Sequence, residues 1–583
     1  MIPRQEHPKP QMERAGWLNL NGTWDFEIDN GRSGLARGLS SPEAKLAESI
    51  LVPFCPESRL SGVEHKDFMY GVWYRRKVEL TQAQTAGCVF LHFGAVDYAC
   101  EVFVNGQSAG THKGGYVSFR FDVTKLVQPG ENVITVYAED DTRDPMIPTG
   151  KQCMKYASYR CNYTRTTGIW QTVWLEFVPQ AHLESVRYET DAESGAVAIT
   201  AQTAGRGTLR TEIFYEGRKL AEQTNESCGG RVMQVFTLPE IHLWEPGCGR
   251  LYDVIFTYGE DTVRSYFGLR SIRMDDRKFY LNGRSVFQRL ILDQGFYPDG
   301  ICTAPEDAEL AADIDRAMTM GFNGARLHEK IFEERFLYYC DKKGYLVWGE
   351  YPSWGLDHSR PEAIYSVLPE WLEELERDRN HPAIIGWCPF NETWDKNERK
   401  QYDDLLRMIY RVTKAVDPSR PCIDTSGHFH VETDIFDIHD YEQDPMVLRP
   451  RYDAFMETGE LYNRFVLWEQ ATKGRVSRRQ EYTGGPVMVS EFGGIRWTGE
   501  AHDWDYGKSW GYGKDVADDE DFKARFKGLC EALLNNDRIF GFCYTQLTDV
   551  EQGQNGLYTY DRQAKFAPEW VRSVVAAKAA IEE

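Results

Sequence analysis

The pattern of apolar and polar positions changes once along this chain, close to Met274. Before that point, short apolar runs alternate with turn residues, as in Glu101-Val-Phe-Val followed by Asn105-Gly106. An Asn-Gly pair between two extended runs signals a hairpin, and closely spaced turns are typical of antiparallel sandwiches. The pattern therefore predicts a β-sandwich over residues 1–180 and a smaller, immunoglobulin-like sandwich over residues 181–274.

From residue 275 to residue 583, strand-like runs alternate with helical stretches. Apolar residues recur at three-to-four spacing over residues 308–320 and 369–379, which predicts two amphipathic helices. Short apolar runs that fit buried strands include Gly324-Ala-Arg, Tyr345-Leu-Val-Trp, Ala383-Ile-Ile-Gly-Trp, Val487-Met-Val and Ile539-Phe-Gly-Phe. This alternation predicts a (β/α)8 barrel, in which functional side chains lie at the C-terminal ends of the strands.

Charge and cysteine usage narrow the class of protein. The formal net charge of −22 argues against nucleic acid or an anionic membrane as a partner, because both require a positive surface. The 13 cysteines are scattered and include no Cys-x-x-Cys pair, which fits reduced thiols better than a disulfide framework or a zinc site. The first residues contain no apolar leader, and no long apolar run follows. We therefore expect a cytoplasmic protein without a membrane span.

Two glutamates occupy matching positions at the ends of short apolar runs. Glu392 follows Asn391 at the end of the run that begins at His381, and Glu491 ends Pro486-Val-Met-Val-Ser. Each glutamate alone fits a strand-end residue that caps a helix or pairs with an arginine. Together they can cleave an acetal, because one carboxylic acid donates a proton while the other attacks the anomeric carbon. The pair within a predicted barrel favours a glycosidase.

Motifs along nearly the whole chain resemble glycoside hydrolase family 2, the family of β-galactosidases, β-glucuronidases and β-mannosidases. In chain order they include Trp17-Leu-Asn-Leu-Asn-Gly-Thr-Trp, Tyr70-Gly-Val-Trp-Tyr-Arg, Gly168-Ile-Trp-Gln-Thr-Val-Trp, Leu243-Trp-Glu-Pro and Tyr266-Phe-Gly-Leu-Arg. The resemblance implies a sugar-binding jelly roll over residues 1–180, an immunoglobulin-like sandwich over 181–274 and a catalytic barrel over 275–583.

The resemblance also implies a retaining hydrolase. Glu392 would be the acid/base, Glu491 the nucleophile, and Asn391 a hydrogen-bond partner of the sugar 2-hydroxyl. The other candidate substrate-binding residues are Asp293, Arg326, His328, Trp354, Trp394, Tyr441 and Trp497.

Several of these candidates have a second interpretation. Asp293 also fits a turn aspartate, and Tyr441 also fits a buried packing residue. Arg326 is expected to pair with Glu491, while His328 is one residue closer to this arginine than in the family pattern. The tryptophans can stack on a pyranose or fill a core, and at least one of the three is expected to touch sugar.

The sequence indicates the type of reaction more clearly than the identity of the terminal sugar. The family's β-glucuronidases use an Asn-x-Lys motif to bind the sugar carboxylate, and the strand-end loops of this chain lack it. We therefore expect an exo-acting β-glycosidase, first of all a β-galactosidase. A β-uronidase, for galacturonides rather than glucuronides, is the alternative, with Arg289, Lys330 or Arg496 meeting the carboxylate.

A catalytically inactive carbohydrate-binding protein is a third interpretation, against which both glutamates and Asn391 stand. The sequence has no glycine-rich phosphate loop and no His-x-x-x-His spacing, so no cofactor and no essential metal are expected. Members of the family often form oligomers, and a homo-oligomer is expected on that basis alone.

Overall fold

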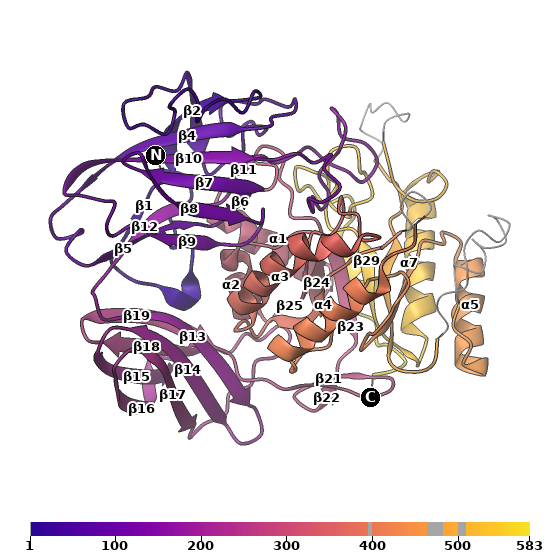
Figure 1. Cartoon of the computed structure of the whole chain (residues 1–583). Coiled ribbons are helices and arrows are strands. Elements are labelled where there is room, and N and C mark those ends of the chain that lie inside the picture. The colour runs from indigo at the N-terminus through magenta and orange to yellow at the C-terminus, as the bar shows by residue number, and fades with distance from the viewer. Residues whose placement is uncertain (1, 395–398, 463–481, 499–508, 583) are drawn as a thin grey trace.

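The computed structural model describes residues 2–394, 399–462, 482–498 and 509–582. These residues form two β-sandwiches and a barrel of alternating strands and helices. Figure 1 shows the two sandwiches on one flank of the barrel, the first in indigo and violet above the second. No helix in the described ranges is both long and apolar enough to cross a bilayer.

The first sandwich packs two antiparallel sheets face to face. One sheet has the order β1 (Trp17–Asn19), β12 (Val173–Val178), β5 (Cys88–Phe93), β9 (Phe119–Asp122). The other has the order β3 (Glu48–Val52), β2 (Gly22–Ile28), β4 (Val72–Leu80), β10 (Gly130–Glu139), β7 (Ala99–Val104), β8 (Gln107–Lys113). A short pair, β6 (Val96–Asp97) and β11 (Gly168–Ile169), follows on the side of the barrel.

The second sandwich has its own apolar core. Its sheets have the orders β13 (His182–Asp191), β14 (Ala196–Ala204), β17 (Gly230–Thr237) and β16 (Arg218–Ser227), β15 (Gly207–Tyr215), β18 (Tyr252–Tyr258), β19 (Asp261–Phe267). Strand β14 alternates between buried and partly exposed side chains, because one face of an antiparallel strand meets the core and the other meets water. A small sheet of β20 (Ile272–Met274), β21 (Phe279–Leu281) and β22 (Arg284–Ser285) leads into the barrel.

Among the described residues, seven parallel strands form the wall of the barrel. Their order is β26 (Ile384–Cys388), β25 (Leu346–Glu350), β24 (Gly324–Leu327), β23 (Gln288–Asp293), β29 (Ile539–Thr545), β28 (Val487–Gly493), β27 (Phe436–Asp440). Every residue of β23 is buried, since helices cover one face of a barrel strand and packed side chains fill the other.

The eighth position of the barrel lies between β26 and β27. Residues 422–426 occupy it and form parallel bridges from Cys422 to Trp387 and from Ser426 to Asn391. The amide of Glu392 also donates to the carbonyl of Ser426, at 3.1 Å. Counted from β23, the segment that ends at Glu392 is therefore the fourth strand, and β28 is the seventh.

The helices lie outside the strands. They are α1 (Asp307–Thr319), α2 (Glu334–Lys343), α3 (Ile364–Asp378), α4 (Asp403–Val416), α5 (Pro445–Thr458), α7 (Asp519–Leu534) and α8 (Pro568–Val575), with short 3-10 turns at Pro10–Met12 and Pro361–Ala363. The predicted helix 308–320 agrees with α1 within one residue. Helix α3 begins before the predicted start at Pro369, because the turn Pro361–Ala363 nucleates it and Pro369 is tolerated inside the helix.

The first sandwich contacts the barrel through the segment between β10 and β11. The amide of Thr149 donates to the carbonyl of Trp354 at 2.7 Å, and the amide of Gly150 donates to that of Pro352 at 3.1 Å. Further along, the amide of Thr164 donates to the carboxylate of Glu551 at 3.1 Å. These bonds hold a first-domain segment against the loops at the C-terminal ends of the barrel strands.

Candidate active site

Two barrel strands bring the predicted carboxylates together. Glu491 lies within β28, and its side chain is 5 % exposed. Glu392 follows β26 with a left-handed backbone, at a φ of 44°, an unusual conformation for a residue with a side chain and one that often marks a functional site. Oxygen atoms of the two carboxylates approach within 4.8 Å of each other.

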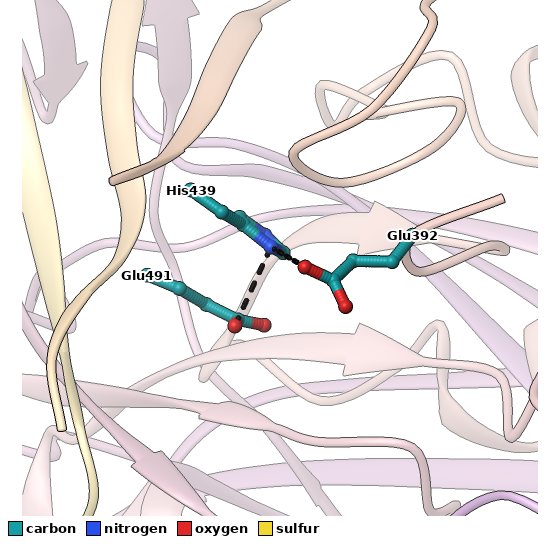
Figure 2. A group of neighbouring side chains, drawn as sticks. All are labelled: Glu392, His439 and Glu491. Carbon is teal, nitrogen blue, oxygen red and sulfur yellow. Dashed lines mark hydrogen bonds and ion pairs between the residues drawn. The ribbon is translucent and has the colours of Figure 1, made fainter. Parts of the chain in front are cut away.

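A histidine that the sequence analysis did not select, His439 on β27, connects the two carboxylates. Its Nδ1 lies 2.8 Å from Oε1 of Glu392 and 3.4 Å from Oε2 of Glu491, and Figure 2 shows the ring between them. Its Nε2 lies 2.9 Å from Oγ of Ser426. Because His439 and Glu491 are register partners on neighbouring strands, the pairing of β27 with β28 fixes this contact.

Arg326, on β24, is the central cation of the site. Its guanidinium donates to Glu491 Oε1 at 3.0 Å, to Asn391 Oδ1 at 3.1 Å and to Glu350 Oε1 at 2.5 Å. Only 3 % of this side chain is exposed, so these bonds form away from bulk water. Charge-assisted bonds of a buried guanidinium hold all three acceptors in fixed positions.

Glu491 is adapted to stay ionised. Burial by itself would raise its pKa, but the neighbouring His439, Arg326 and His328 outweigh burial and hold that pKa below its ordinary value. The hydroxyl of Tyr441 also donates to Glu491 Oε2, at 2.5 Å. An ionised, hydrogen-bonded carboxylate at this position can act as a nucleophile.

Three of the predicted residues surround Glu392. The indole of Trp354 donates to the carbonyl of Asn391 at 3.1 Å, and the indole of Trp394 donates to Glu392 Oε2 at 3.4 Å. The side-chain nitrogen of Asn391 is buried and has no acceptor among the described residues. This amide is therefore a donor available to a bound molecule.

The remaining predicted residues are His328, Asp293 and Trp497. His328 Nδ1 lies 3.9 Å from Glu491 Oε1 and 3.2 Å from Glu350 Oε2. Asp293 accepts the amide of Gly295 at 2.9 Å, which matches the turn interpretation of this residue. Trp497 is 6 % exposed and belongs to the apolar core.

The three cations considered for a sugar carboxylate have other partners. Arg289 pairs with Glu582 at 2.6 Å, and Lys330 donates to the carbonyls of Gly295 and Cys302. Arg496 pairs with Asp515. The structure therefore engages all three in contacts within the protein.

The sequence contained a signal for His439 that the analysis did not use. His439 lies in β27 two residues before the predicted Tyr441, which directly follows the strand, and this two-residue spacing is typical of side chains on one face. Glu350 is the last residue of β25, and its bonds to Arg326 and His328 depend on side-chain paths that no local pattern predicts.

The arrangement supports acid–base and nucleophilic chemistry on one substrate. Carboxylates about 5 Å apart are typical of retaining glycosidases, whereas inverting enzymes hold them about 6.5–9.5 Å apart. The atoms of Glu392, His439 and Glu491 also lie close enough together to hold a metal ion. A metal at this position would compete with the contacts of His439 to both carboxylates.

Comparisons with known proteins identify the family. Residues 60–179 match the model of the glycosyl hydrolases family 2 sugar binding domain, and residues 272–495 match that of the family 2 TIM barrel domain. A β-galactosidase of Thermoanaerobacter pseudethanolicus is 27% identical over 68% of this chain, and this chain spans only about half (55%) of that relative's length. A β-glucuronidase of Streptococcus agalactiae is 20% identical over 94% of each chain.

The fold of the whole chain also matches a solved structure. The β-glucuronidase of Ruminococcus gnavus, solved in complex with D-glucuronic acid, superimposes with a TM-score of 0.75 over 98% of this chain and 100% of that one, at 19% identity. The match shows that the order of two sandwiches and a barrel is shared.

Proposed function

This chain belongs to glycoside hydrolase family 2, and we propose that it is a retaining exo-β-glycosidase. The observation that carries the proposal is the close pair of carboxylates, with oxygens within 4.8 Å and His439 in contact with both. Such a spacing leaves room for attack on the anomeric carbon by a carboxylate and none for a water molecule on the opposite face.

In the first step, Glu491 attacks the anomeric carbon and forms a glycosyl ester. Arg326 and Tyr441 bind the two oxygens of this carboxylate and orient it for attack. Glu392 donates its proton to the glycosidic oxygen, so the aglycone leaves as a neutral alcohol.

In the second step, Glu392 takes a proton from water, and the hydroxide attacks the anomeric carbon from the face that the aglycone left. The ester has removed the negative charge of Glu491, which favours the ionised form of Glu392 at this stage. Displacement at the same carbon twice returns the original β configuration.

The unpartnered amide of Asn391 supports binding of a sugar hydroxyl beside the reacting carbon. Asn391 accepts from Arg326 through Oδ1, so its nitrogen points away from that bond and remains free to donate. We assign this donor to the 2-hydroxyl of the terminal sugar. A hydrogen bond at this hydroxyl strengthens as positive charge develops on the ring in the transition state.

For the terminal sugar, a β-galactoside and a β-uronide are the two candidates. Relatives of this chain are named β-galactosidase and β-glucuronidase. A uronide requires a cation in the pocket, and Arg289, Lys330 and Arg496 are engaged elsewhere. A different lysine, described below, favours the uronide.

The test is an initial-rate panel on p-nitrophenyl β-D-galactoside, β-D-galacturonide, β-D-glucuronide, β-D-glucoside and β-D-mannoside at neutral pH. For any substrate that is cleaved, proton NMR recorded in the first minutes gives the configuration of the released sugar. The β-anomer is expected first. Initial release of the α-anomer would refute the retaining mechanism, and no turnover of any substrate would favour a binding protein without catalysis.

A further inference from the structure

A lysine from the first sandwich reaches the barrel beside the carboxylate pair. Lys151 lies in the segment between β10 and β11, and only 6 % of the residue is exposed. Its ammonium lies 3.4 Å from the centroid of the Trp354 ring, which belongs to the barrel. Lys151 is far from every barrel motif along the chain, so no local sequence pattern marks it.

The backbone on both sides of Lys151 is held in place. Before it, Thr149 and Gly150 donate to carbonyls of the barrel, at 2.7 and 3.1 Å. Gly150 has a φ of 56°, and a Cβ at this position would lie 2.3 Å from the carbonyl oxygen of Glu329. The close approach of the two backbones therefore requires glycine.

After Lys151, the side chain of Gln152 anchors the segment in the first sandwich. Its nitrogen donates to Asp97 Oδ2 at 2.6 Å and contacts the Tyr116 hydroxyl at 3.0 Å, and its oxygen accepts the amide of Thr166 at 2.8 Å. Lys151 is thus fixed between two domains, so its ammonium loses little further freedom when a ligand binds.

The charge of Lys151 is not neutralised inside the protein. No described residue forms an ion pair with its ammonium or accepts a hydrogen bond from it. The nearby Glu329 instead accepts from the Ser353 hydroxyl at 3.0 Å and from the amide of Trp354 at 2.9 Å. Burial raises the pKa of Glu329 to about 8, even though Lys151 opposes that rise.

The ammonium also lies close to the reacting groups. Trp354, whose ring it covers, donates to the carbonyl of Asn391, the residue before Glu392. Burial and the nearby Lys151 lower the pKa of His328 well below its ordinary value, and His328 is 3.9 Å from Glu491. Lys151 therefore lies beside residues that contact the carboxylate pair.

We propose that Lys151 binds the carboxylate of a terminal β-linked hexuronide, which makes the first sandwich a determinant of substrate specificity. This inference rests on the proposed exo-β-glycosidase function. An unpaired, nearly buried cation is costly to maintain, and a sugar carboxylate would supply the missing counter-charge. Lys151, which belongs to the first sandwich, would thus bind the sugar carboxylate in place of the lysine of the Asn-x-Lys motif, which the strand-end loops of this chain lack.

The experiment compares two substrates that differ only at C6, p-nitrophenyl β-D-galacturonide and p-nitrophenyl β-D-galactoside, with p-nitrophenyl β-D-glucuronide as a second uronide. Lys151→Met keeps the side-chain length against Trp354 and removes the charge, while Lys151→Arg keeps the charge. Lys155→Met is the matched control, because Lys155 lies in the same segment but is exposed and contacts Tyr159. Melting temperatures show whether each variant is folded.

We expect the wild type to prefer a uronide. Lys151→Met should lower kcat/KM on that uronide about 10- to 100-fold, mostly through KM, the range expected for one charge-assisted hydrogen bond. The galactoside rate should change by less than about threefold, Lys151→Arg should recover part of the uronide rate, and Lys155→Met should match the wild type.

Two results would overturn the assignment of Lys151. One is a wild type that cleaves the galactoside in preference to both uronides. The other is an equal loss on charged and neutral substrates in a folded Lys151→Met, which would make Lys151 a support for Trp354.

Failure of the proposed function gives a different pattern. If no substrate is cleaved, calorimetric titration with D-galacturonate and D-glucuronate still tests the lysine. Binding to the wild type that is lost in Lys151→Met would keep the carboxylate assignment without catalysis. Equal or absent binding in both proteins would refute it.

Discussion

At the scale of single residues, the ionisation state and the stability of each buried charged side chain in the site depend on the charges of its neighbours. Arg326 contacts two buried carboxylates, Glu350 and Glu491, while His439 contacts Glu491 and Glu392. A buried charge that loses its partner is strongly destabilising, so substitutions here change stability together with activity unless they preserve shape. Isosteric substitutions therefore test the catalytic role of a residue with the least effect on folding.

The first prediction separates the roles of the two glutamates. Glu491→Gln should abolish nearly all turnover, because a neutral amide cannot form the glycosyl ester. Glu392→Ala should lose about 10²–10⁴-fold on substrates with poor leaving groups, the usual contribution of general acid–base catalysis, and less on an aryl glycoside.

Azide provides the control for this pair. It should partly restore the rate of Glu392→Ala on an aryl glycoside, because azide needs no general base to attack the ester, and it should not help Glu491→Gln. Wild-type rates in both variants would show that these glutamates are not the catalytic pair.

A second prediction concerns His439 and the pH dependence of kcat/KM. Among the groups that lower the pKa of Glu491, His439 has the largest effect. Removing it in His439→Gln should raise that pKa, so Glu491 becomes protonated at a higher pH and the acid limb of the profile should move to higher pH. The control is His112→Gln, which changes a histidine of the first sandwich that pairs with Glu373 of helix α3, and it should leave the limb unchanged. An unmoved limb in His439→Gln would show that His439 does not tune the nucleophile.

At the scale of elements, strand ends place the carboxylates and a connecting segment completes the site. Glu392 and Glu491 come from the fourth and seventh positions of the barrel, and the register of β27 with β28 adds His439. The segment around Lys151 has no regular structure of its own. Its position comes from backbone bonds to the barrel at Thr149 and Gly150.

The third prediction tests this segment through its glycine. Gly150→Ala should lower the free energy of unfolding by more than about 2 kcal/mol, because the new Cβ overlaps the carbonyl of Glu329 as well as straining a positive φ. It should also reduce kcat/KM, since the segment must shift.

Gly217→Ala is the matched control, because Gly217 has a φ of 76° in the hairpin between β15 and β16 and nothing lies within 4 Å of its Cβ position. Gly217→Ala should lower the free energy of unfolding by about 1 kcal/mol and leave kcat/KM unchanged. Equal losses in the two variants would contradict the close approach.

At the scale of the whole molecule, the first sandwich has its own apolar core and also contributes side chains to the core of the barrel. The apolar cluster of the barrel includes Tyr116, Tyr163 and Trp170 of the first sandwich, whereas the second sandwich has a separate cluster. Carboxyl groups are buried in the same region. Burial raises the pKa of Glu57 and Glu370 to about 7, and that of Asp140 to about 8.

The fourth prediction is that stability falls as the pH rises from about 6.5 to 8.5. At the lower end of this window the folded protein binds protons that the unfolded chain has already released, so the unfolding free energy decreases with pH until the folded carboxyls ionise as well. Each carboxyl should contribute about 1 kcal/mol. His7 and His92, whose pKa values burial lowers to about 4, act in the opposite direction only below about pH 6.5.

Thermal or denaturant unfolding at several pH values measures this slope. Glu57→Gln is the diagnostic variant, because the amide keeps the shape of a side chain that accepts from the Thr167 hydroxyl at 2.6 Å and cannot ionise. It should flatten the slope. A wild type whose stability is constant between pH 6.5 and 8.5 would show that these carboxyls are already ionised in the folded state.

The sequence by itself determined the type of each part and the identity of the main chemical groups. Alternating short runs predicted the sandwiches, and βα alternation predicted the barrel, because the period of apolar positions reflects which faces an element buries. Family motifs singled out Glu392, Glu491, Asn391 and Arg326, which the structure brings into one cluster.

Only the tertiary structure decided which side chains share a charge environment. His439 meets both carboxylates through strand register, and Lys151 reaches the barrel from another domain. Strand patterns are local, whereas these contacts join residues far apart in the chain, so they depend on how the elements pack. The electrostatics of the site follow from that packing, because the energy of a charge depends on burial and on neighbours that the sequence does not order in space.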